Sequence, residues 1–129
     1  MSGWSPEDLA ALGDGDELRI ASYRPDGSLR PFVRIWFVWA GDELYVRSAY
    51  GPENGWYRRA KASGTGRIAG GGTERDVTFE VSGPEARSSV TTAYRAKYQR
   101  YAANIVATVV SGDAERSTLR LLPSPRAPR

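Results

Sequence analysis

A tight Gly-Asp turn at residues 41–42 constrains the fold more than any other feature of this 129-residue chain. It separates two runs, residues 30–39 and 43–49, that are rich in aromatic and β-branched side chains, a pattern typical of a β-hairpin with a two-residue turn. In such a hairpin Ala40 pairs with Glu43, and the remaining pairs follow by counting outward. The turn therefore predicts which side chains share each face of the hairpin.

The register gives the hairpin an apolar face and a mixed face, and we expect the apolar face to point into the core. On the mixed face Arg34 and Arg47 occupy diagonal positions, and Trp36 lies opposite Arg47. Neighbouring guanidinium groups repel unless an anion lies between them, so this face is either a ligand pocket or a solvent-facing surface on which Arg stacks on Trp. The apolar face consists of Val33, Ile35, Phe37, Trp39, Leu44, Val46 and Ser48, and the mixed face of Phe32, Arg34, Trp36, Val38, Tyr45, Arg47 and Ala49.

Local patterns predict three helices. A first helix follows the Ser-Pro start at residues 5–6. A second, Arg-rich helix begins after Asn54 and ends near Gly64. A third and longer helix covers residues 84–106, because apolar side chains recur there on one stripe. The stripe consists of Val90, Tyr94, Tyr98, Tyr101 and Ile105.

Six short strands complete the prediction, and in the fifth of them Val77, Phe79 and Val81 are expected to point inward. Six strands with these helices describe a mostly β protein with added helices (α+β), built as a small antiparallel barrel. Residues 1–122 are expected to form a single domain, followed by a flexible Pro/Arg-rich tail at 123–129. The strands are expected at residues 18–23, 30–39, 43–48, 66–70, 76–81 and 117–122.

Positive charge is concentrated in residues 47–75. This stretch has six basic and two acidic side chains, a net charge of +4, whereas the whole chain carries +3. The second helix contributes free backbone N–H groups at its start, which together with Arg47, Arg58 and Arg59 are typical of an anion site. The alternative is a connecting helix whose Trp56 fills the end of the barrel and whose Arg side chains are solvated.

The composition excludes several kinds of chemistry. With no Cys and no His, the chain has no disulfide, no thiolate or imidazole metal site, and no Ser-His or cysteine nucleophile, so we expect no metal. No run approaches the roughly 18 apolar residues of a transmembrane helix, and the N-terminus lacks the pattern of a secretory signal. We therefore expect a cytoplasmic protein whose chemistry comes from a cofactor or from the ligand itself.

Blocks of sequence at residues 44–48, 55–60 and 66–68, with Gly51 between the first two, carry a family resemblance. With them the chain resembles the flavin-binding split β-barrel superfamily and looks most like an uncharacterised bacterial family within it. It is similar, more distantly, to the deazaflavin-dependent nitroreductases and to pyridoxamine-phosphate-oxidase-like proteins. The resemblance implies a six-stranded split β-barrel with an N-terminal helix, a short helix after the third strand and a longer one before the last.

The resemblance also implies positions for a cofactor. In the deazaflavin-dependent relatives the matching strand, turn and helix lie beside the cofactor, and basic residues there hold its phosphate. The nitroreductases tend to carry Asn where Arg59 and Ala60 stand here, so FMN and a deazaflavin both remain open. The direct matches are Arg47, Ser48, Gly51 and Trp56, with Arg58, Arg59 and Lys61 as neighbours.

The first functional hypothesis is a flavin- or deazaflavin-dependent oxidoreductase that acts on a small organic molecule. In it Tyr45 or Tyr50 donates a hydrogen bond or proton to the substrate, and an arginine set holds the phosphate while two Trp side chains wall the ring. The arginine set is Arg34, Arg47, Arg58 and Arg59, and the Trp side chains are Trp36 and Trp56.

Three alternatives stay open. The first is a cofactor-free enzyme or binding protein whose arginines clamp the carboxylate of an organic acid or natural product. The second is a non-catalytic homodimeric module that pairs through Trp36, Trp39 and Tyr45, since split barrels commonly pair through a sheet face. Nucleic-acid binding ranks last, because the basic residues gather in one short segment.

Overall fold

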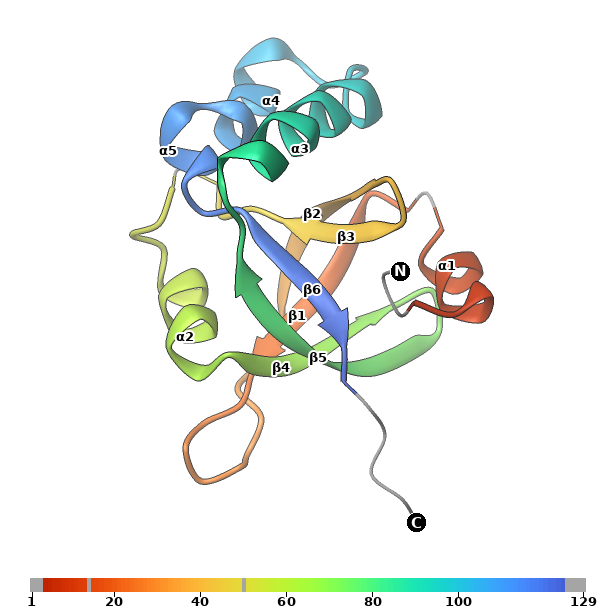
Figure 1. Cartoon of the computed structure of the whole chain (residues 1–129), viewed down its shortest axis with the longest axis vertical. Coiled ribbons are helices and arrows are strands. Elements are labelled where there is room, and N and C mark those ends of the chain that lie inside the picture. Colours follow the sequence, from red (N-terminus) through yellow and green to blue (C-terminus); the bar gives the residue numbers. More distant parts are fainter. Residues whose placement is uncertain (1–3, 14, 50, 125–129) are drawn as a thin grey trace.

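The computed structural model describes residues 4–13, 15–49 and 51–124. Six antiparallel strands close into a barrel in the order β1-β2-β3-β6-β5-β4, which confirms the predicted α+β barrel (Figure 1). Closure leaves no free sheet edge among these strands. The strands are β1 (Glu17–Ser22), β2 (Val33–Ala40), β3 (Glu43–Val46), β4 (Thr65–Gly70), β5 (Thr73–Val81) and β6 (Leu119–Pro123).

The register predicted for the β2–β3 hairpin is confirmed, with Ala40 opposite Glu43 and Phe37 opposite Val46. The apolar face points into the barrel as expected, where Phe37 and Val46 are fully buried. The predicted inward direction fails at Val81, the last residue of β5, which is 47% exposed. The barrel core consists of Trp4, Leu12, Leu18, Ile20, Ile35, Phe37, Leu44, Val46, Trp56, Tyr57, Ala60, Ile68, Val77, Leu119 and Leu121.

The first two predicted helices are also confirmed, as α1 (Pro6–Leu12) and α2 (Gly55–Ser63). Ser5 caps α1, because its hydroxyl accepts a hydrogen bond from the Asp8 backbone N–H at 3.1 Å. Gly64 ends α2 in the left-handed region, with φ of 74°, as expected for a glycine after a helix. Within the described residues no helix has the length and hydrophobicity needed to span a membrane.

The predicted longer helix before the last strand is confirmed from Pro84, but its predicted end near residue 106 is wrong, because the chain breaks into α3 (Pro84–Lys97), α4 (Ala103–Val110) and the short α5 (Gly112–Glu115). The break follows Tyr98, whose hydroxyl accepts from the Phe37 N–H at 3.1 Å and lies 2.6 Å from the Asp16 carbonyl oxygen. Ile105 belongs to α4 and is 43% exposed, so the expected stripe ends before it.

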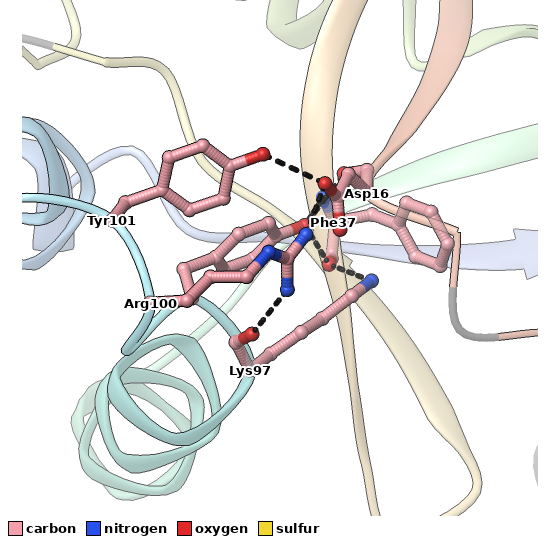
Figure 2. Close-up of polar contacts among 6 residues, drawn as sticks. Asp16, Phe37, Lys97, Arg100 and Tyr101 are labelled. Atoms are coloured by element: carbon pink, nitrogen blue, oxygen red, sulfur yellow. Dashed lines mark hydrogen bonds and ion pairs between the residues drawn. The ribbon is translucent and has the colours of Figure 1, made fainter.

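Asp16 holds the broken segment against the barrel, as Figure 2 shows. Its carboxylate accepts a hydrogen bond from the Tyr101 hydroxyl at 2.7 Å and forms an ion pair with Arg100. Lys97, at the end of α3, donates to the Phe37 carbonyl at 2.8 Å. Side-chain hydrogen bonds and an ion pair thus attach the segment after α3 to the barrel end.

Helices cover Trp36, Val38, Tyr45 and Arg47 on the mixed face of the hairpin, whereas Arg34 on the same face is exposed. In Figure 1, α3, α4 and α5 lie together over the side of the barrel that β2 and β3 form. Trp36 stacks on Tyr98, with ring centroids 4.0 Å apart and planes 4° apart. This second core consists of Val38, Tyr45, Val90, Tyr94, Tyr98, Val106 and Val109, with Trp36, Ala40, Ala49 and Tyr101 among the side chains at its edge.

Candidate functional site

A cleft of about 670 Å³ lies between helix α2 and the segment that joins β1 to β2. In Figure 1 this joining segment is the orange loop that projects from the barrel near α2. Four arginines line the cleft, two from the joining segment and two from α2, and we call it the arginine cleft. Its lining is Tyr23, Arg24, Pro25, Arg30, Gly55, Arg58, Arg59, Ala62, Ser63 and Thr65.

The joining segment is an ordered turn. Asp26 accepts hydrogen bonds at its carboxylate from the Ser28 N–H at 2.9 Å and the Ser28 hydroxyl at 2.6 Å, which lowers the pKa of Asp26. Gly27 supplies the positive φ of 87° that the turn requires, and Arg24 N–H donates to the Ser28 carbonyl at 2.7 Å. These hydrogen bonds therefore fix the backbone of the turn that carries Arg24 and Arg30.

Among the residues that the structure describes, no acidic side chain lines the arginine cleft. None of its four arginines forms an ion pair within the described residues, whereas Arg67, Arg75, Arg100, Arg116 and Arg120 all do. The Nε atom of Arg30 is also shielded from solvent and has no hydrogen-bond partner in the described part of the chain. The cleft thus gathers four guanidinium groups, of which Arg24 has the Asp26 carboxylate of its own turn nearby but none forms an ion pair within the described residues.

The start of α2 adds to this charge. The side chain of Asn54 makes no capping hydrogen bond to the helix, so the positive end of the helix dipole lies at the cleft without a side-chain acceptor. Gly55 has a steric role here, because a Cβ atom on it would lie 2.8 Å from Nη1 of Arg59. The missing side chain lets the Arg59 guanidinium lie against the first turn of the helix.

A second, smaller cavity of about 180 Å³ adjoins the arginine cleft, and we call it the inner chamber. Arg30 and Arg59 line both spaces. The rest of its lining is largely apolar and includes the buried side chain of Trp56. The full lining is Ile20, Ala21, Ser22, Arg30, Pro31, Val33, Trp56, Arg59 and Ala60.

Tyr23 supplies the phenolic hydroxyl of the cleft lining. This hydroxyl donates to the Asp76 carboxylate at 2.6 Å, and that hydrogen bond raises the pKa of Tyr23. Arg67 also donates to the same carboxylate oxygen, at 3.0 Å. The Tyr23 hydroxyl is therefore held by Asp76, and among the described residues the cleft lining contains no carboxylate to serve as a general base.

Of the residues predicted from the sequence, Trp56, Arg58 and Arg59 reach these two cavities. Arg47 lies elsewhere and is only 1% exposed. Its Nε donates to Thr118 Oγ1 at 2.8 Å, Nη1 to the Val109 carbonyl at 2.9 Å, and Nη2 to the Arg87 carbonyl at 2.8 Å. Burial lowers the pKa of Arg47, and the surrounding acceptors stabilise its charge.

The other predicted residues do not line the cleft. Ser48 is buried and its N–H donates to Ser117 Oγ at 2.8 Å. Gly51, with φ of 106°, packs against α5, where a Cβ would lie 2.9 Å from the Asp113 Cβ. Arg34 is exposed on the outside of β2, Trp36 and Tyr45 pack under α3, and Tyr50 lies outside the described residues.

Tyr23, Arg24 and Arg30 are site residues that were not predicted. The signal for them was the barrel itself, because a closed sheet has to pair β1 with β4. This pairing brings the end of β1 beside the start of β4, which follows α2 directly. A prediction that paired β1 with β4 could have placed Arg24 and Arg30 near α2.

The barrel and its helices define the fold, a split β-barrel that is shared with the solved structures of a putative pyridoxamine 5'-phosphate oxidase and an F420-H2 dependent reductase. The chain belongs to the family described as "Uncharacterized protein conserved in bacteria (DUF2255)", whose model matches residues 8–121. A search among curated proteins gave no match.

Solved structures share the fold at low sequence identity. The heme storage protein HutZ from Vibrio cholerae has a TM-score of 0.64 and 11% identity, over 96% of this chain and 91% of that one. The F420-H2 dependent reductase FDR-A has a TM-score of 0.61 and 16% identity, over 83% of this chain and 93% of that one. A putative pyridoxamine 5'-phosphate oxidase from Listeria innocua has a TM-score of 0.59 and 13% identity, over 94% and 92%.

Proposed function

We propose that the protein binds FMN or a deazaflavin by its phosphate in the arginine cleft and acts as an oxidoreductase on a small organic molecule. The observation that carries this proposal is a cleft with four arginines and no carboxylate on a split β-barrel. The chain has neither His nor Cys, so the cofactor supplies the hydride chemistry.

The residues of the cleft fit a phosphate group. Arg30 has a shielded Nε without a partner in the described chain, and Arg59 lies against the start of α2, where backbone N–H groups favour anions. Arg58 adds a third guanidinium from the same helix. In this proposal the three arginines hold the phosphate, and the Tyr23 hydroxyl orients the part of the ligand that lies deeper in the cleft.

Comparing FMN with riboflavin tests the phosphate directly, because the two ligands differ only in that group. After an absorbance spectrum of the freshly purified protein, FMN, riboflavin and F420 are titrated by calorimetry. We expect FMN or F420 to bind, and FMN to bind at least about tenfold more tightly than riboflavin, with an affinity that falls as salt is added. Absence of binding by both FMN and F420 contradicts the proposal.

A second function is a cofactor-free protein that binds or transforms an organic acid, and one observation favours it. Arg47 is matched to the family's cofactor contacts by sequence, but each of its three guanidinium nitrogens donates to an internal acceptor, and Gly51 packs against α5. In this case an organic acid raises the unfolding temperature while FMN and F420 do not. Stabilisation by a flavin excludes this second function.

The homodimer and the cytoplasmic location expected from the sequence remain part of the proposal. The sequence predicted a dimer interface that includes Trp36 and Tyr45. Both side chains pack under α3, so the helices occupy the surface that this interface requires. Sedimentation of the purified protein measures the oligomeric state, and a monomer at micromolar concentration contradicts the dimer.

A further inference from the structure

The inner chamber differs from the arginine cleft in the chemistry of its walls. Ile20, Val33, Trp56 and Ala60 give it an apolar lining continuous with the barrel core. Apolar cavities in proteins stay dry and attract apolar groups of matching size. A ligand that extends beyond the arginine cleft therefore gains binding free energy by placing an apolar group in this chamber.

The size of the inner chamber limits that group. A cavity of roughly 150 Å³ lined by aliphatic and aromatic side chains accommodates benzene in another protein. The inner chamber, at about 180 Å³, therefore fits one six-membered ring or a short alkyl chain. A tricyclic flavin ring needs considerably more space, so it does not enter, and the chamber is left for a different molecule or a different part of one.

Two arginine side chains lie where the inner chamber meets the arginine cleft. Arg30 and Arg59 line both the inner chamber and the arginine cleft. Arg30 approaches from the β1–β2 segment and Arg59 from α2, and the shielded Nε of Arg30 has no partner within the described residues. A guanidinium fork binds a carboxylate or phosphate through paired hydrogen bonds, so an anion is favoured directly beside the apolar chamber.

We propose that the inner chamber binds the apolar body of a small organic anion, one ring or a short alkyl chain joined directly to a carboxylate or phosphate that Arg30 and Arg59 hold. This inference rests on the proposed function in that it takes the arginine cleft to be a ligand site, and it names the substrate class. Arg30 and Arg59 are then shared between the substrate anion and the cofactor phosphate, which each guanidinium contacts through different N–H donors. The ring-sized body selects against larger acids, and the two arginines select against neutral analogues of the same shape.

Calorimetric titration with a matched ligand set tests the inference. Benzoate, hexanoate and phenyl phosphate carry the proposed features, benzamide lacks the charge, inorganic phosphate lacks the apolar body, and anthracene-9-carboxylate is too large. We expect at least one of the first three to bind at least about tenfold more tightly than each of the last three. The inference is overturned if none of the first three binds at least about tenfold more tightly than all of the last three.

Two variants locate the binding. Val33→Phe places a ring in the inner chamber and should weaken the best of the small organic anions at least about tenfold while leaving inorganic phosphate unchanged. Its control is Val81→Phe, at an exposed strand position away from both cavities. If Val33→Phe does not fold, Arg30→Gln replaces it and should weaken the same anion about tenfold. The control for Arg30→Gln is Arg95→Gln, at an exposed position on α3. Unchanged affinity in the folded variant overturns the inference.

The FMN and F420 titrations keep the two proposals apart. Binding of the small organic anion without either flavin leaves the inner-chamber inference standing and contradicts the oxidoreductase proposal. Binding of a flavin without any of the small organic anions overturns the inner-chamber inference and leaves the oxidoreductase proposal intact.

Discussion

Arg47 and Arg30 are both shielded arginines near a helix, and they differ in what surrounds them. Arg47 has three acceptors within 2.9 Å, from Thr118, Val109 and Arg87, and its guanidinium lies over the Tyr94 ring at 5.6 Å. Arg30 has a shielded Nε without a partner in the described chain and borders two cavities. A buried arginine whose donors are matched stabilises the fold, whereas one with unmatched donors at a cavity is available to a ligand.

This comparison changes the functional reading of the basic stretch at 47–75. Arg47 lies on the helix-covered face under α3 to α5, Arg58 and Arg59 line the arginine cleft beside α2, and Arg67 and Arg75 form ion pairs elsewhere on the barrel. Of the positions matched to the family's cofactor contacts, Arg47, Ser48 and Gly51 are buried away from the cleft, whereas Trp56 lines the inner chamber. Variants in the two regions should therefore separate loss of stability from loss of ligand affinity.

The largest effect is expected from Arg47→Met. It removes the donors that satisfy the Val109 and Arg87 carbonyls and the Thr118 hydroxyl, and should lower the free energy of unfolding by about 3 kcal/mol or more. Urea denaturation measures this loss. Arg34→Met, at an exposed position on β2, is the control and should change stability by less than about 0.5 kcal/mol. If Arg47→Met stays stable and loses ligand affinity, Arg47 belongs to the binding site.

The double variant Arg58→Glu and Arg59→Glu should show the opposite result, a loss of ligand affinity without a loss of stability. Reversing both charges in the arginine cleft should weaken FMN or F420 binding about 100-fold, equivalent to about 2.7 kcal/mol, with little change in stability. Calorimetry and urea denaturation measure the two quantities. Lys61→Glu with Arg95→Glu makes the same change in net charge on exposed positions outside the cleft lining and is the control. Equal loss in both double variants means that net charge alone, and not the cleft, attracts the ligand.

Gly51→Ala tests whether the residue matched by family resemblance acts through packing. A Cβ at its positive φ is strained and meets Asp113 at 2.9 Å, so we expect a loss of about 2 kcal/mol in unfolding free energy and no change in FMN affinity of the folded protein. Gly112→Ala is the control, because a Cβ there meets nothing within 4 Å. A loss of FMN affinity at unchanged stability would place Gly51 in the binding site.

The barrel could be predicted because its signals are local. The turn at 41–42 sets the β2–β3 register, and the glycines near residues 64 and 71 punctuate α2 and the strands beside it. The arginine cleft could not be predicted in the same way, because it joins residues 23–30 to α2 only through the pairing of β1 with β4. The concentration of positive charge along the sequence indicated that α2 belongs to an anion site. It did not indicate that the turn at residues 23–30 lies on the other side of that site.

The covered face was mispredicted for a related reason. Nothing near Arg47 in the sequence shows that the Val109 carbonyl of α4 meets it, since the two are 62 positions apart. The helix break after Tyr98 carries neither Gly nor Pro, and its cause is the contact of that hydroxyl with Asp16 and Phe37 on the barrel. Tertiary hydrogen bonds of this kind override helical periodicity and leave no local trace.

The smallest expected effect concerns Asp16, which holds the covered face at its far end. Hydrogen bonds from Arg100 and Tyr101 lower the pKa of Asp16 below its ordinary value of 3.8. A carboxylate with a lowered pKa contributes stability that is fully present above the pKa of the unfolded chain and is lost as the pH falls through the lower, folded value. We therefore expect the unfolding temperature to fall below about pH 4, and Asp16→Asn to reduce this fall relative to Asp42→Asn, which removes an exposed carboxylate of the β2–β3 turn. Scanning calorimetry across this range measures the difference, and identical profiles for the two variants would show that the Asp16 contacts do not stabilise the attachment of the helices to the barrel.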